Sequence, residues 1–155
     1  MGSGEGETRV PITPIVTLVE GSHARIRRGL EALEQARDVD EIRAIVCDLP
    51  ELLAEHFEAE EKPGGLFDEL GSLRPTIDSQ LRFLRQEHRE ILQALDGLRQ
   101  RLREAGEATH AGELEHRHEH IRVSAACFMQ LVRHHECIET QLVSDTYYTE
   151  DGGSG

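Results

Sequence analysis

The residues best suited to chemistry are two histidine–glutamate pairs that share one spacing. His56 and Glu60 form one H-x-x-x-E pair, and His135 and Glu139 form the other. Residues four apart lie on one face of a helix, so each imidazole has a carboxylate one turn away on the same side. Imidazole nitrogens are ligands for iron, zinc and copper, and a carboxylate can hold two ions through its two oxygens. The two pairs therefore predict a metal site.

Each pair is preceded by one more histidine on an apolar helical stripe. His23 precedes the first pair and His88 precedes the second. In a four-helix bundle, side chains that face inward from different helices converge. Four imidazoles and two carboxylates at these intervals therefore suit a pair of metal ions. The predicted metal ligands are His23, His56, Glu60, His88, His135 and Glu139.

The expected burial of the two glutamates is the strongest indication of a bound cation. A neutral histidine costs little to bury, whereas an unpaired buried carboxylate is expensive and tends to become protonated. Glu60 and Glu139 each lie one turn after a stripe histidine, on the inward side, so we expect a dication as their partner. The neighbouring acids point elsewhere on the helical wheel, and we expect them to need only water: Glu55, Glu58, Glu61 and Glu136.

A second group of histidines is a weaker candidate. His116, His118 and His120 cluster in EHRHEHI. On a helix, however, His116 and His118 lie about 160° apart, and none of the three shares the direction of His135. We expect a solvated face there, with weak surface metal binding as the alternative.

Four long segments with helical spacing of apolar residues must position the predicted ligands. We expect helices over about 17–37, from a cap at Asp38 or Asp40 to Lys62, over 75–104 and over 111–147. Pro50 falls inside the second helix and lacks a backbone N–H, so we expect a kink near residues 46–49. Short connections favour an all-α fold, an antiparallel up-down-up-down four-helix bundle.

Length, charge and composition narrow the function classes. The 155 residues fit one domain, which we place at 13–148 between a flexible lead (1–12) and a flexible tail (149–155). The formal net charge of −13 opposes binding to nucleic acid or anionic lipid. No apolar run is long enough for a membrane span and the N-terminal residues do not resemble a signal peptide, so we expect a cytoplasmic protein. Three cysteines without C-x-x-C spacing indicate buried thiols rather than a disulfide framework or zinc site: Cys47, Cys127 and Cys137.

The chain resembles the hemerythrin-like, or HHE, cation-binding domains over about residues 16–148. The resemblance rests on His23, HFEAE (56–60), Glu87-His88 and HECIE (135–139). The segments EEKPGGLFDEL and YYTEDGG are similar to a bacterial branch of the family whose members are not oxygen carriers.

The resemblance implies a hemerythrin-like four-helix bundle around two non-haem irons, bridged by two carboxylates and an oxo or hydroxo group. Carried onto this chain, it implies that His23 and His56 hold one iron and that His88 and His135 hold the other. The bridging carboxylates would then be Glu60 and Glu139.

Two departures from the oxygen carriers bear on function. The carriers have a second histidine one turn after the one in the third helix, where Leu92 stands, and an aspartate where Thr140 stands. The iron held by His88 would then lack one protein ligand, and both irons would keep open positions. The resemblance thus implies a protein that reacts with or senses oxygen, peroxide or nitric oxide, as in oxidative stress, and a catalase-like peroxide-decomposing activity is compatible with it.

Two other functions fit the same residues. The first is an interaction module in which iron or redox state alters folding and hence the binding of a protein partner, without turnover. The second is a metal-free helical bundle. Metal analysis separates the metal-free bundle from the other functions, and peroxide turnover separates the reactive site from the interaction module.

Overall fold

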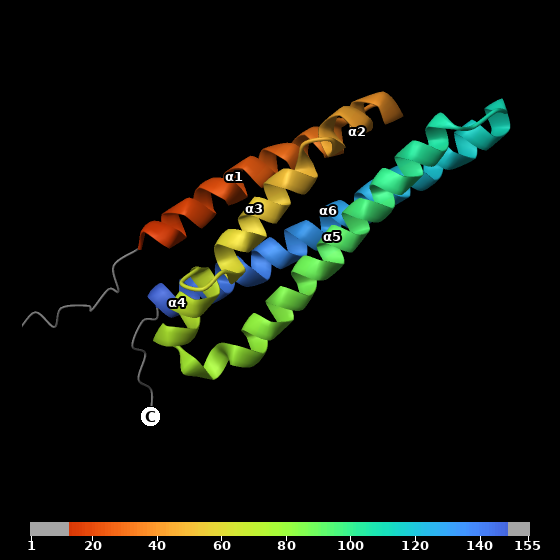
Figure 1. Cartoon of the computed structure of the whole chain (residues 1–155). Coiled ribbons are helices and arrows are strands. Elements are labelled where there is room, and N and C mark those ends of the chain that lie inside the picture. Colours follow the sequence, from red (N-terminus) through yellow and green to blue (C-terminus); the bar gives the residue numbers. More distant parts are fainter. Residues whose placement is uncertain (1–12, 149–155) are drawn as a thin grey trace, which may run out of the picture.

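The computed structural model describes residues 13–148, and within them it contains helices but no strand. Four antiparallel rods form a bundle (Figure 1). Each rod is one long helix, except that two successive helices make up the second rod. The rods are α1 (Pro14–Gln35), the successive helices α2 (Val39–Val46) and α3 (Leu49–Glu61), α5 (Asp78–Gly106) and α6 (Ala111–Tyr147). The predicted four-helix bundle is confirmed. The predicted lead and tail, 1–12 and 149–155, lie outside the described residues.

Pro50 breaks the second rod instead of kinking it. α2 ends at Val46, and α3 starts at Leu49 with Pro50 in its first turn. A proline in that turn removes an N–H that would have no helical partner anyway, so starting a new helix costs less than bending an old one. Asp38 caps α2, where its side chain accepts a hydrogen bond of 2.9 Å from the backbone N–H of Glu41.

Two glycines allow the turn after α3. Gly64 has a φ of 76°, in the left-handed region that favours glycine. A Cβ on Gly65 would lie 2.6 Å from the backbone oxygen of Ala59, which is too close for any other residue. The chain then forms α4 (Leu66–Leu73) and the 3-10 helix η1 (Pro75–Ile77).

The third long helix begins later than predicted. Pro75 opens η1, and α5 starts only at Asp78. Arg74 lies outside the helical region, with φ −136° and ψ 84°, because a residue that precedes proline avoids helical geometry. The 3-10 turn allows Ile77 to pack into the apolar cluster that also contains Leu70 and Leu81.

The apolar core has two parts. One cluster, at the end of the bundle that carries α2, includes Ile26, Leu53, Ile91 and Val132. The other, at the end that carries α4, has these members: Val16, Val19, Leu66, Phe67, Leu70, Ile77, Leu81, Leu84, Leu142 and Tyr147. Along α1, α5 and α6, the predicted metal ligands fall between residues of the first cluster and residues of the second, and in α3 they follow Leu53 of the first cluster. The bundle therefore contains a polar layer between two apolar halves.

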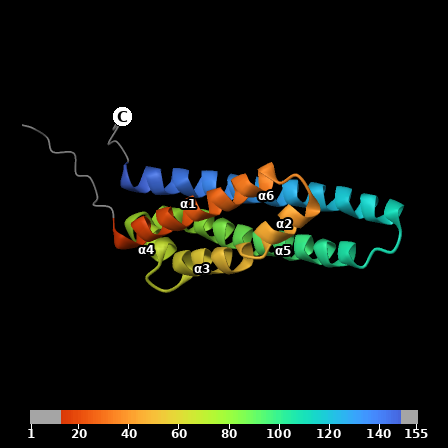
Figure 2. The same ribbon diagram turned by 90° about the horizontal axis from the view of Figure 1, so that it is seen from above.

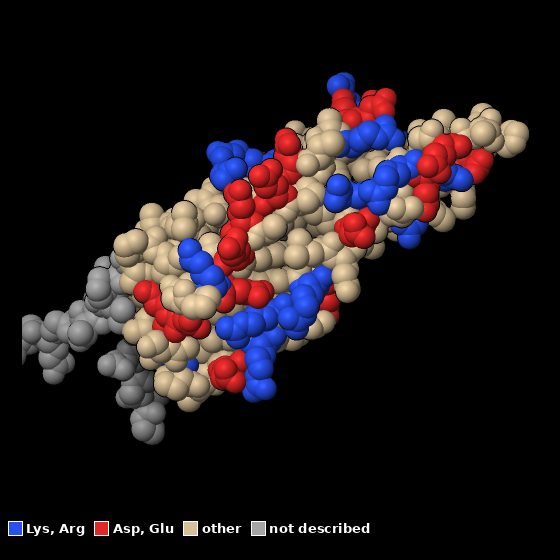
Figure 3. Space-filling model, in the orientation of Figure 1, with Lys and Arg blue, Asp and Glu red and all other residues tan. Residues whose placement is uncertain are grey.

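The surface differs from expectation at the cysteines. Cys47, Cys127 and Cys137 are exposed free thiols, so the prediction that they are buried is wrong. Cys127 directly precedes the buried Phe128 and so lies off the buried stripe of α6. On the face in Figure 3, acidic side chains gather over α3 and basic side chains over α5, so neither sign covers the face. No helix within 13–148 combines the length and apolarity that crossing a membrane requires.

The α5–α6 hairpin is longer than the rest of the bundle. α6 has 37 residues against 22 in α1, and α5 and α6 continue together past the end of α2 (Figure 2). The polar layer lies where all four rods are present, so each rod contributes to it.

Candidate metal centre

The structure brings all six predicted ligands together in the polar layer. His23 comes from α1, His88 from α5, and one histidine–glutamate pair each from α3 and α6. The carboxylates Glu60 and Glu139 are 0% exposed, and all four histidines are buried. Their role as ligands stays a prediction, whereas their convergence is a feature of the fold.

The six side chains form two overlapping groups that share the carboxylates. His23 and His56 belong to one group, His88 and His135 to the other, and the potential ligand atoms of each group lie within 4.8 Å of one another. Oε1 of Glu60 is 2.6 Å from Nε2 of His56, and its Oε2 is 2.9 Å from Nε2 of His88.

Glu139 is placed in the same way. Its Oε1 is 2.8 Å from Nε2 of His23, and its Oε2 is 3.2 Å from Nε2 of His135. Each carboxylate thus presents one oxygen to each group. This is the arrangement that two bridging carboxylates need to hold two ions.

The two histidines of the second group approach each other as ligands of one ion do. Nε2 of His88 lies 3.0 Å from Nε2 of His135. Two nitrogens that each lie about 2.1 Å from one ion, at right angles, are separated by roughly 3 Å. The spacing therefore fits two neighbouring ligands of an octahedral ion.

The layer lacks hydrogen-bond donors for its acceptors. All four carboxylate oxygens of Glu60 and Glu139 are buried without a hydrogen-bond partner, and so is Nε2 of His23. Buried polar atoms are almost always paired, because an unpaired one costs a few kcal/mol. Metal ions would satisfy these atoms together, so the donor set fits a dinuclear metal site.

Burial keeps two of the imidazoles neutral. Desolvation, and then the charge of His23, lowers the pKa of His56 to about 4. Desolvation, and then the charge of His135, lowers the pKa of His88 to about 2. Both rings are therefore unprotonated at neutral pH, which is the form that binds a metal.

Glu60 and His135 hold protons where cations would lie, whereas Glu139 is ionised. Burial and the charge of Glu139 raise the pKa of Glu60 well above its usual range. Burial opposes ionisation of Glu139, but the close approach of the His135 and His23 imidazoles outweighs it and holds the pKa of Glu139 well below its usual range. Burial likewise opposes protonation of His135, but the nearby carboxylate of Glu139 and the hydrogen bond to Glu87 outweigh it and raise the pKa of His135. Metal binding must therefore displace protons.

Three further carboxylates lie beside this layer, and sequence reasoning did not predict their contacts. Glu61 lies 2.5 Å from Nδ1 of His88, and Glu87 lies 3.0 Å from Nδ1 of His135. Glu136 is buried and lies 3.6 Å from Nε of Arg27. The expectation that Glu61 and Glu136 need only water is wrong, because each faces a neighbouring helix. The helical wheel of a single helix contains no signal for such partners.

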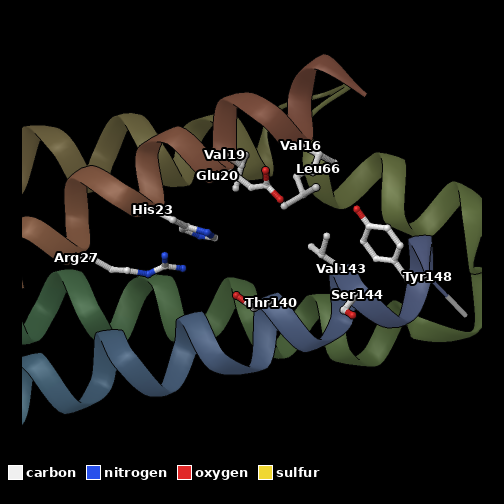
Figure 4. A pocket seen from close by; sticks show the side chains of 10 residues that line it. All are labelled: Val16, Val19, Glu20, His23, Arg27, Leu66, Thr140, Val143, Ser144 and Tyr148. Atoms are coloured by element: carbon white, nitrogen blue, oxygen red, sulfur yellow. The ribbon is translucent and has the colours of Figure 1, made fainter. Parts of the chain in front are cut away.

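A cavity reaches the layer from outside. It has a volume of about 470 Å³, lies between α1 and α6, and is lined on one side by His23. Figure 4 shows the imidazole of His23 and the guanidinium of Arg27 facing this space from α1, opposite Thr140 and Ser144 of α6. A small molecule can therefore reach the edge of the layer.

Leu92 does not face the layer. It is 36% exposed, and Ile91 takes the buried place on its stripe. A histidine at position 92 would therefore point partly to solvent, and the geometry gives no support to the expectation that Leu92 leaves a metal position open.

The surface histidines do not form a comparable site. His116 and His120 are exposed, with ring centroids 4.2 Å apart, and His118 is half-buried. In the described part of the chain, the only groups of three or more potential ligands are the two in the polar layer.

Comparison with known proteins bears on this geometry. Residues 15–147 match the family model described as the hemerythrin HHE cation binding domain. Searches of curated proteins and of solved structures found no match. The family match spans the four long rods and every residue of the polar layer, and on that basis the chain belongs to the hemerythrin HHE cation-binding domain family.

Proposed function

We propose that this protein binds two iron ions in the polar layer and reacts with, or senses, oxygen, peroxide or nitric oxide. The observation that carries the proposal is the donor set. Four imidazoles converge with two carboxylates whose four oxygens lack any hydrogen-bond donor. A metal-free bundle would leave these atoms unpaired in its interior, at a cost that folding rarely tolerates.

The ligand types fit iron, which binds both imidazole and carboxylate. The layer offers only nitrogen and oxygen atoms, and the three cysteines of the chain are exposed on its surface. Each position has two imidazoles and one oxygen from each bridging carboxylate. A six-coordinate ion would keep positions for an oxo or hydroxo bridge and for a small molecule.

When bound, a pair of irons supplies the electron transfer that none of these side chains can perform. The chain itself holds the ions close together, excludes bulk water by burial, and leaves the cavity beside His23 as the entry for small molecules. Disproportionation of two hydrogen peroxide molecules gives two waters and one dioxygen. One peroxide is oxidised and the other is reduced, so this reaction needs no external reductant.

The test is stopped-flow absorbance of the reduced, iron-loaded protein mixed with oxygen, together with oxygen evolution from hydrogen peroxide. We expect rapid oxidation by oxygen and measurable peroxide decomposition. Glu60→Ala is the matched variant, and it should lose both signals. Oxygen uptake that vacuum reverses, without peroxide turnover, would point to an oxygen carrier instead.

One observation favours a second function. The polar layer separates two apolar clusters, so the packing of both halves depends on what neutralises the layer. An interaction module could use this dependence to report iron occupancy to a protein partner. A stable di-iron protein with no turnover of peroxide, and with folding that depends on iron, would support this function over catalysis.

A further inference from the structure

The two metal positions differ in the residues that contact Nδ1 of their histidines. His88 and His135 each contact a carboxylate through Nδ1, Glu61 at 2.5 Å and Glu87 at 3.0 Å. In the described part of the chain, Nδ1 of His56 is buried without a hydrogen-bond partner. No hydrogen bond or ion pair there joins Nδ1 of His23 to another residue, since its contacts with the shared carboxylates use Nε2.

These contacts determine where the ring protons lie. An ionised carboxylate only accepts hydrogen bonds, so Glu61 and Glu87 each favour a proton on Nδ1 of the ring they contact. The lone pair of Nε2 then faces the layer. An outer carboxylate of this kind orients a metal-binding histidine and makes it a stronger ligand, and its negative charge attracts a cation.

Aromatic rings add to the difference. Phe57 stacks on His88 with ring centroids 3.8 Å apart and an interplanar angle of 14°, and Phe67 lies at 5.4 Å and 16°. His23, by contrast, faces the cavity between α1 and α6, with the cationic side chain of Arg27 beside the same space (Figure 4). The His88–His135 position thus has a carboxylate on Nδ1 of each imidazole and an aromatic ring stacked on His88, whereas the His23–His56 position borders an open space.

We propose that the two positions fill in order. The His88–His135 position binds first and more tightly, and Glu61 and Glu87 are the positioning residues that make it so. The His23–His56 position fills second and exchanges its ion more readily. The inference rests on the dinuclear site proposed above, and it gives the chain a singly loaded form when iron is scarce and a doubly loaded form when iron is abundant.

The test is an anaerobic titration of the full chain with Fe²⁺ against a competing chelator. The wild-type chain should show two steps whose dissociation constants differ at least tenfold. Glu61→Gln should weaken the tight step by roughly 10–100-fold and leave the weak step unchanged. The matched control is Glu58→Gln, an exposed glutamate of the same helix, which should change neither step.

Substitution of single ligands shows which metal position gives rise to each step of the iron titration. The tight step should survive His23→Ala and be lost in His135→Ala. Three results would each overturn the order of filling and leave the dinuclear site intact. They are two wild-type steps of equal affinity, a tight step that Glu61→Gln leaves unchanged, and a tight step that is lost with His23→Ala. A wild-type chain that binds no iron would overturn both proposals.

A readout without metal excludes a merely structural role for Glu61. Its side chain is 35% exposed, so Glu61→Gln should fold and melt as the wild type does. In ¹H–¹⁵N spectra of the metal-free chain, the His88 ring should carry its proton on Nδ1 in the wild type and shift toward a mixture of tautomers in the variant. The same tautomer in both proteins would argue against the positioning role.

Discussion

The histidines of the polar layer and the histidines of residues 116–120 have the same chemistry and opposite surroundings. The first set is buried and faces carboxylates whose oxygens have no donors, whereas His116 and His120 are exposed and His120 contacts Arg101. Density of histidine in the sequence is higher in the second set. Buried acceptors that lack donors therefore indicate a candidate metal site better than local richness in ligand residues does.

The largest contrast between the two sets is expected in metal content. Glu139→Ala removes one oxygen from each metal position, so we expect loss of most bound iron. His118→Ala should retain the wild-type content, because no group of three potential ligands includes His118. Metal analysis of the purified proteins measures this, and equal iron content in both variants would refute the ligand assignment.

Removal of metal should destabilise the fold. A ligand present at a thousandfold excess over its dissociation constant stabilises a protein by about 4 kcal/mol. For a chain of this size that amounts to roughly 10 °C in melting temperature. Calorimetry with and without a chelator tests this, and Glu139→Ala provides the control, since its melting temperature should not respond to the chelator. An unchanged wild-type melting temperature would mean that the layer does not need a cation.

The metal-free protein should lose stability in mild acid. The folded pKa values of His56 and His88, about 4 and about 2, lie below the usual value of 6.5, so below that pH the unfolded chain binds two more protons at these sites. The raised pKa values of Glu60, His135 and Glu136 work in the opposite direction and offset part of this difference. We expect the two imidazoles to dominate, so that the free energy of unfolding falls as the pH drops from roughly 6 to 5.

Denaturant unfolding at several pH values measures this slope. His88→Gln removes one of the titrating imidazoles, so its stability should depend less steeply on pH in the same window than that of the wild type. A wild-type stability that rises as the pH falls would show that the protons on the carboxylates dominate.

The smallest effect is expected at the surface. Leu92→His adds a histidine one turn after His88, but from a position that is 36% exposed. We therefore expect unchanged iron content and a change of unfolding free energy within about 0.5 kcal/mol. A third bound ion or a clear change in the iron spectrum of this variant would show that position 92 does reach the layer.

The sequence was sufficient to predict the bundle and the set of residues that converge. Helical periodicity placed 111–147 as one helix, and the repeated H-x-x-x-E spacing placed both glutamates on the inward side. These features are local, because spacing within one helix determines which side chains share a face.

Contacts between helices were less accessible to sequence reasoning. Glu61 follows Glu60 directly and by the wheel alone should face solvent, yet α5 lies there and places His88 against it. Pro50 was recognised as a disruption, but whether it bends or divides a helix depends on how the flanking residues pack. The cavity beside His23 likewise arises from the spacing of α1 and α6 and has no counterpart in either segment alone.

The most direct test of the central claim is iron X-ray absorption of the anaerobically loaded protein after gel filtration. We predict two irons per chain, a coordination sphere of nitrogen and oxygen only, and scattering from a second iron at about 3.5–4 Å, the usual separation in two-metal sites. One iron per chain without a neighbouring iron, or a sulfur ligand, would contradict a dinuclear site in the polar layer.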